Sequence, residues 1–105
     1  IASTGGTLED RKNVKIEKVE ISSLNYSYRS KYTDVNTTIK NNSDKNIQYI
    51  KINLYFKDGN GDIVKSEWTN DSSTIKPGAS QTISKMTNKE GWEVVSAEID
   101  EVKFK

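Results

Sequence analysis

The 105-residue sequence contains no cysteine and no histidine. Their absence excludes disulfide frameworks, thiol nucleophiles, zinc sites built on these residues and Ser-His-Asp triads. The chain also lacks any apolar run near the roughly 20 residues that span a bilayer, so we expect no direct membrane insertion by this segment. No signal peptide is recognisable, and we expect any export signal or anchor to lie outside these residues.

A strong excess of either charge is also missing, because 16 basic residues face 15 acidic ones. A balanced surface produces no net field that would draw the domain onto nucleic acid, so no nucleic-acid partner is expected. Of the basic residues 14 are lysine. Arginine, whose planar guanidinium binds phosphate through two hydrogen bonds, is the more usual residue in phosphate-binding surfaces. The charges therefore indicate a solubilising surface.

The apolar residues present are mostly β-branched. Isoleucine and valine number 18, whereas leucine and alanine, which favour helices, number only 6. Side chains branched at Cβ suit the pleated surface of a sheet. A chain of this length fits one compact domain with one core, and its composition predicts that the domain is built from strands.

Residues 1–13 are small or polar and show no period, which predicts a flexible N-terminal linker or stalk remnant. Residues 14–105 are predicted to form a single sandwich domain of about seven strands, with no convincing helix. The alternation of apolar residues shifts phase near Glu17-Lys18 and near Asp100-Glu101. Each shift predicts a β-bulge, in which one extra residue restores the inward face.

The clearest strand is predicted around residues 49–57, where Ile50, Ile52, Leu54 and Phe56 alternate with polar neighbours. We expect it to be the central strand, with these four side chains in the core. Residues 58–62 predict a hairpin turn and residues 63–68 its partner strand, followed by a loop at Thr69–Ser73. Lys76-Pro77-Gly78 predicts a type II turn, because Gly accepts its positive φ.

Several motifs between Thr37 and Phe104 occur in the order found in a known family. They are the Asn-rich turn Ile39–Ser43, Leu54–Asp58 at the end of the apolar strand, Gly61–Val64, Ile75–Gly78 and a last strand through Ile99 and Val102. In this arrangement the chain resembles the FxLYD family of bacterial extracellular domains. The family's Phe-x-Leu-Tyr-Asp signature appears here as Ile52-Asn53-Leu54-Tyr55-Phe56-Lys57-Asp58. The resemblance implies an immunoglobulin-like antiparallel β-sandwich in a secreted, lipid-anchored or membrane-tethered Gram-positive protein, with no known catalytic residues.

Asp58, Asn60 and Asp62 place oxygen-bearing side chains at alternate positions, as the start of an EF-hand loop does. The remaining positions do not fit, because Ile63 stands where Gly is needed and Thr69 where a bidentate Glu is needed. A hairpin turn whose Asp side chains cap backbone N–H groups is the favoured interpretation, and a weak calcium site is the alternative.

Aromatic residues form two candidate surfaces. Tyr49, Tyr55 and Trp68 would form a ligand platform if they were exposed side by side, although shelter under a neighbouring strand is the simpler expectation. Interleaved aromatic and basic residues could bind sugars or an anionic wall polymer, or could simply form cross-strand pairs; they are Tyr26, Tyr28, Arg29, Lys31 and Tyr32. Trp92 is expected to be buried, because a large aromatic surface is costly to leave in water.

These features favour a non-catalytic extracellular or cell-surface-anchored module that binds a protein or cell-wall polymer. The alternatives are a pure spacer between an anchor and another domain, and a small hydrolase that uses paired carboxylates. No catalytic, metal or cofactor residue is assigned.

Overall fold

The computed structural model describes residues 8–22, 25–27 and 30–105. Its elements, in chain order, are α1 (Leu8–Lys12), β1 (Val14–Ile21), β2 (Asn25–Ser27), β3 (Ser30–Asn41), β4 (Ile47–Lys57), β5 (Ile63–Asp71), β6 (Ser80–Asn88) and β7 (Val94–Phe104). The prediction of an all-β chain of about seven strands is confirmed.

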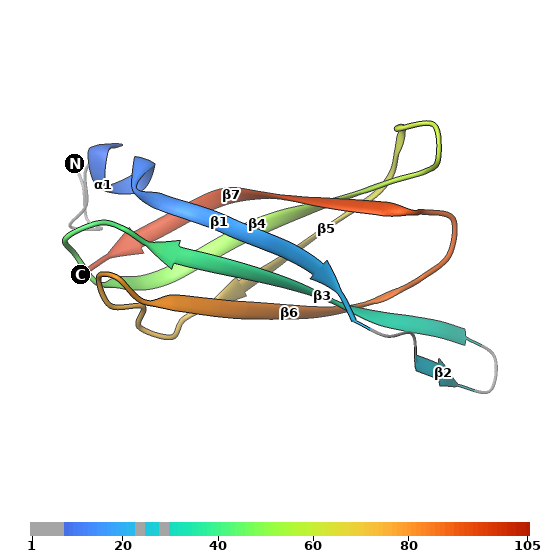
Figure 1. The fold of residues 1–105 in the computed structure, drawn as a ribbon, viewed down its shortest axis with the longest axis horizontal. Helices are drawn as coiled ribbons and strands as arrows, with labels where there is room; N and C mark the ends of the chain where they lie inside the picture. The colour runs from blue at the N-terminus through green and yellow to red at the C-terminus, as the bar shows by residue number, and fades with distance from the viewer. Residues whose placement is uncertain (1–7, 23–24, 28–29) are drawn as a thin grey trace.

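The strands form two antiparallel sheets that face each other (Figure 1). In the first, sheet A, the long strand β3 pairs with β6 along one side. Along its other side it pairs with β2 over residues 30–32 and with β1 over residues 35–41. In the second, sheet B, β4 lies between β5 and β7. These orders match A-B-E and C′-C-F of immunoglobulin domains, so the immunoglobulin-like antiparallel β-sandwich is confirmed.

Strand β4 is the central strand of sheet B, as its alternation predicted. Ile50, Ile52, Leu54 and Phe56 are fully buried and form the middle of the core. Burying each such side chain stabilises the fold by about 1.5 to 3 kcal/mol. The outward residues of β4 from Tyr49 to Lys57 are half-buried rather than freely exposed, because strands lie on both sides of β4.

Both predicted bulges are present. The pairing of β1 with β3 shifts between Ile16 and Lys18, so Glu17 is the extra residue. The pairing of β4 with β7 shifts where Ile99 and Glu101 flank Asp100. The bulges turn Val19 and Val102 back toward the core after the phase changes, because each adds one residue to a period of two.

Two predicted boundaries are wrong. Thr69–Asp71, expected to be loop, continue β5 and pair with residues 50–52 of β4. The polar residues Thr87–Gly91 also predict a loop after a strand that ends at Met86, but strand β6 continues through Thr87 to Asn88. Backbone pairing with a long central strand outweighs polar composition here, because the ladder hydrogen bonds do not depend on the side chains.

The structure describes part of the segment that the sequence predicted to be a linker. Residues 1–7 lie outside the described part, but Leu8–Lys12 form the helical turn α1, which is too short to show a sequence period. Arg11 Nη2 donates to the carbonyl oxygen of Asp100 at 2.8 Å, which holds the turn against β7. Within the described ranges no helix is both long and apolar enough to cross a bilayer.

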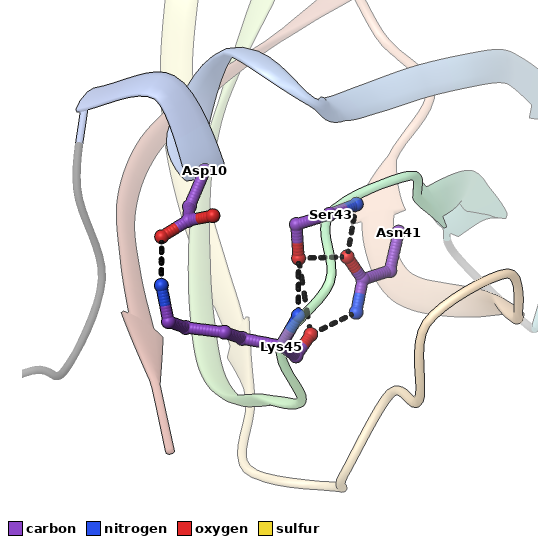
Figure 2. Close-up of polar contacts among 4 residues, drawn as sticks. All are labelled: Asp10, Asn41, Ser43 and Lys45. Carbon is purple, nitrogen blue, oxygen red and sulfur yellow. Dashed lines mark hydrogen bonds and ion pairs between the residues drawn. The ribbon is translucent and has the colours of Figure 1, made fainter.

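The Asn-rich turn between β3 and β4 is organised by the buried side chain of Asn41 (Figure 2). Its Nδ2 donates to the carbonyl oxygens of Lys45 and Ile75, both at 2.8 Å. Its Oδ1 accepts from the N–H and the hydroxyl of Ser43. Lys45 Nζ also binds the Asp10 carboxylate at 2.6 Å and so ties α1 to the turn. All hydrogen-bonding atoms of the Asn41 amide are used, so this cluster stabilises the turn.

Candidate ligand-binding face

The outer surface of sheet B carries three of the predicted aromatic residues. The alternation that buries Ile50 to Phe56 turns the intervening residues of β4 outward, and β5 adds a tryptophan from the neighbouring strand. We call this surface the aromatic face, and it consists of Tyr49, Lys51, Asn53, Tyr55 and Trp68.

Strand register brings Trp68 and Tyr55 close together. Trp68 pairs with Asn53 and Ser66 pairs with Tyr55, so the two aromatic side chains are diagonal neighbours. Diagonal neighbours lie roughly 7 to 8 Å apart, within reach of aromatic side chains. A hollow of about 270 Å³ lies between them, lined by Asn53, Tyr55, Ser66, Glu67 and Trp68.

Trp68 is the most open member of the aromatic face, with 55% of its surface exposed. Lys51 Nζ lies 4.9 Å from the centre of its ring, and the same amine is 3.3 Å from Asp100 Oδ2. The indole N–H of Trp68 donates to no group in the described part of the chain. One side of the ring and its donor are therefore available to a ligand.

Tyr55 is held in place by a carboxylate on the other neighbouring strand. Its hydroxyl donates to Glu98 Oε1 at 3.0 Å. This hydrogen bond raises the pKa of Tyr55, because the phenol must be protonated to donate, and desolvation raises the pKa further. Tyr55 is thus a neutral phenol in a fixed orientation.

Tyr49 lies apart from this pair. It is six residues from Tyr55 along β4, which corresponds to roughly 20 Å of strand. Its hydroxyl accepts from Asn70 Nδ2 at 3.3 Å, and Lys103 Nζ lies 5.0 Å from its ring centre. The structure therefore brings together two of the three predicted platform residues, Tyr55 and Trp68.

A second hollow of about 480 Å³ lies on the other side of Trp68, along the free edge of β5. We call it the β5 edge cleft, and its lining residues are Ser66, Glu67, Trp68, Thr69 and Asn70 of β5 and Lys85 of β6. Ser66, Glu67 and Trp68 line both hollows. The two hollows therefore adjoin and form one candidate site around Trp68.

The Asp58–Asp62 segment forms a turn of the kind that the sequence favoured. Asp58 Oδ1 accepts from the N–H groups of Asn60 at 2.9 Å and Asp62 at 3.0 Å. Gly61 has φ 85°, a conformation that glycine adopts without strain. Asp62 contributes its backbone N–H to the turn, rather than the predicted carboxylate cap. In the described ranges no three acidic residues gather in a way that could hold a metal ion.

The other aromatic predictions have different outcomes. Tyr28 and Arg29 lie outside the described residues, and for Tyr26 and Lys31 the structure describes only the backbone, which pairs β2 with β3. Of the predicted basic and aromatic surface, only the side chain of Tyr32, half-buried on β3, is therefore described. Trp92 is only 2% exposed, so its predicted burial is confirmed.

Sequence reasoning missed two lysines of the site. Lys51 could have been found, because it lies between Tyr49 and Tyr55 in the outward phase of β4. Lys85 carries no such signal, since its place beside Trp68 depends on how β6 of one sheet lies against β5 of the other.

Comparisons with known proteins support the fold. No protein-family model matches the chain, and no curated protein matches it. The crystal structure of a DUF1425 family member from Shewanella sp. pv-4 superposes with a TM-score of 0.53 at 14% identity, covering 84% of this chain and 77% of that chain. Northeast Structural Genomics Consortium target SoR45 aligns with a TM-score of 0.47 at 15% identity, covering 87% and 84%. The Shewanella protein shares the β-rich fold, and at this identity the likeness extends to the fold alone.

Proposed function

We propose that this domain is a non-catalytic binding module of a secreted or surface-anchored bacterial protein, of the FxLYD type that its motifs resemble. Its ligand is a polymer of the cell wall, and the contact surface is the site around Trp68. The observation that carries the proposal is the exposure of Trp68 beside Tyr55, with a hollow on each side.

An exposed tryptophan next to a tyrosine on a regular sheet face supports binding, because together the two rings offer a large apolar surface with polar groups at its edges. Flat aromatic side chains with few rotamers are well suited to binding, since they lose little conformational entropy when a ligand binds. Asn53 and Ser66 add neutral hydrogen-bonding groups to the hollow between the rings. Such a surface suits sugar rings, which have both apolar faces and hydroxyl groups.

The described site favours binding over the two alternatives. A carboxylate-dependent hydrolase needs two carboxyl groups on opposite sides of one bond, and Glu67 is the only carboxylate lining either hollow within the described ranges. A spacer in series would have the chain enter and leave at opposite ends. Here α1 and the C-terminus lie at the same end of the sandwich (Figure 1), an arrangement that does not favour a spacer in series.

The test is co-sedimentation of the purified domain with protease-treated cell walls of a Gram-positive bacterium. We expect saturable binding that Trp68→Ala weakens about tenfold or more. Met86→Ala is the matched control, because Met86 is 64% exposed on sheet A. Absence of binding by the unaltered domain, or equal losses in the two variants, would refute the proposed function.

A further inference from the structure

Lys85 is a half-buried lysine without a partner in the described part of the chain. It lies on β6, opposite Val35 of β3, in the inward phase that also contains Ile83 and Thr87. At this position its side chain lines the β5 edge cleft together with Trp68. No hydrogen bond or ion pair engages its amine within the described ranges.

The other charges around the cleft are already compensated. Glu67 is the only other charged residue in the lining, and its Oε2 lies 3.4 Å from Lys65 Nζ and accepts a hydrogen bond from the Thr87 hydroxyl. On the far side of Trp68, Lys51 is paired with Asp100. The positive charge of Lys85 therefore remains for a ligand.

The rest of the lining is chemically suited to a sugar chain. Ser66, Thr69 and Asn70 supply hydroxyl and amide groups that donate and accept hydrogen bonds. Trp68 supplies a flat apolar ring beside them. The volume of about 480 Å³ falls within the range of small-ligand sites.

We propose that the β5 edge cleft binds the anionic group of an extracellular carbohydrate polymer, with Lys85 as its cation, while a neighbouring sugar ring stacks on Trp68. This inference rests on the proposed function and deepens it by naming the class of polymer. The anionic group is a carboxylate or a phosphate, and a lysine amine binds either as a compact point charge.

Isothermal titration calorimetry with three soluble oligomers of matched length tests the inference. The probes are an oligogalacturonate, which carries carboxylates, an oligomer of glycerol phosphate, and a neutral chitooligosaccharide. We expect at least one anionic oligomer to bind about tenfold or more tightly than the neutral one, with the preferred oligomer identifying the anion. Rising salt should weaken its binding.

Two variants, each with one lysine replaced by glutamine, test whether Lys85 is the cation that binds the anionic group. Lys85→Gln should weaken binding of the preferred anionic oligomer about tenfold, and should leave binding of the neutral oligomer within about twofold. Lys76→Gln is the control, because Lys76 is exposed in the turn between β5 and β6. Its effect should stay within about twofold. Circular dichroism of both variants verifies that they are folded.

The outcomes separate this inference from the proposed function. Equal effects of the two lysine variants, equal affinity for neutral and anionic oligomers, or no binding of either anionic oligomer would overturn the inference. Wall binding that depends on Trp68 but not on Lys85 would overturn it while leaving the proposed function intact. Binding only to walls that were not treated with protease would indicate a protein partner and contradict both.

Discussion

The two tryptophans of this chain have opposite environments. Trp92 is 2% exposed, and its ring centre lies 4.8 Å from that of Phe56 at 60°, an edge-to-face contact. Its indole N–H donates to the carbonyl oxygen of Asn88 at 2.8 Å. Trp68 is 55% exposed, and its indole N–H has no acceptor in the described part of the chain. Trp92 thus has the apolar contacts and the hydrogen bond that stabilise a core, and Trp68 has neither.

The difference follows from where each residue lies relative to the strands. Trp92 precedes β7 in the loop that closes one end of the sandwich, where its ring fills space next to Phe56. Trp68 lies in the outward phase of β5, opposite Asn53. Composition alone would predict burial for both. The contrast teaches that packing and hydrogen bonding in the core account for the place of Trp92 but not for that of Trp68.

The largest expected effect is on the stability of the Trp92 variant. Trp92→Ala should lower the free energy of unfolding by about 3 to 5 kcal/mol, because it leaves a cavity beside Phe56. Trp68→Ala should change it by no more than about 0.5 kcal/mol, as surface substitutions usually do. Urea unfolding followed by circular dichroism measures both values. Similar losses in the two variants would contradict the contrast.

The same contrast between buried and exposed extends to two neighbouring asparagines. Asn41→Ala should cost about 1 to 3 kcal/mol, because the carbonyl oxygen of Ile75 and the Ser43 groups lose their buried partner. Asn42 is exposed, and Asn42→Ala should stay within about 0.5 kcal/mol. Urea midpoints of the two variants provide the comparison. An equal shift in both would show that the Asn41 cluster does not stabilise the turn.

Fluorescence quenching sharpens the comparison because it reports the exposure of each ring directly. Acrylamide should quench the emission of Trp68 strongly and that of Trp92 weakly, because the quencher must touch the ring. Trp68→Phe should therefore leave a blue-shifted emission that is hard to quench, and Trp92→Phe a red-shifted emission that is easily quenched. Stern–Volmer plots of the two variants measure this, and overlapping plots would rule out the difference in exposure.

The smallest effect concerns Tyr55, the neighbour of Trp68. Its pKa is raised above the usual value of about 10, chiefly by the hydrogen bond to Glu98, so Glu98→Gln should lower it. Since the folded-state pKa is the higher one, the linked stabilisation is present below about pH 10 and is lost as the pH rises through the folded-state pKa. Absorbance titration at alkaline pH compares the variants, with Glu101→Gln as the control. An unchanged titration in Glu98→Gln would contradict the assigned cause.

The sequence was sufficient to predict the features governed by period and turn chemistry. The inward residues of β4, the bulges at Glu17 and Asp100 and the turn with Gly78 at φ 84° follow from local rules. The Pro-Gly turn is closed by the N–H of Ala79 donating to the carbonyl oxygen of Lys76 at 2.9 Å. These features need no knowledge of how the sheets face each other.

The features that were missed depend on contacts between distant segments. The helical turn α1 is held by groups far along the chain, including the Asp100 carbonyl oxygen, which no local pattern reveals. The closeness of Trp68 to Tyr55 follows from the register of β5, and that of Trp68 to Lys85 from the packing of the two sheets. A single sequence specifies neither, so only part of the candidate site could be predicted.

The contact of Arg11 with β7 has a consequence for solubility. Strand β7 is an edge of sheet B, and an uncovered edge offers free backbone groups to a strand of another molecule. Arg11 uses the carbonyl oxygen of Asp100 at the bulge, and so masks part of that edge with a charged side chain. A chain shortened to begin at Val14 is therefore expected to self-associate through β7. Sedimentation velocity would measure this, and a shortened chain that stays monomeric would show that Arg11 does not protect the edge.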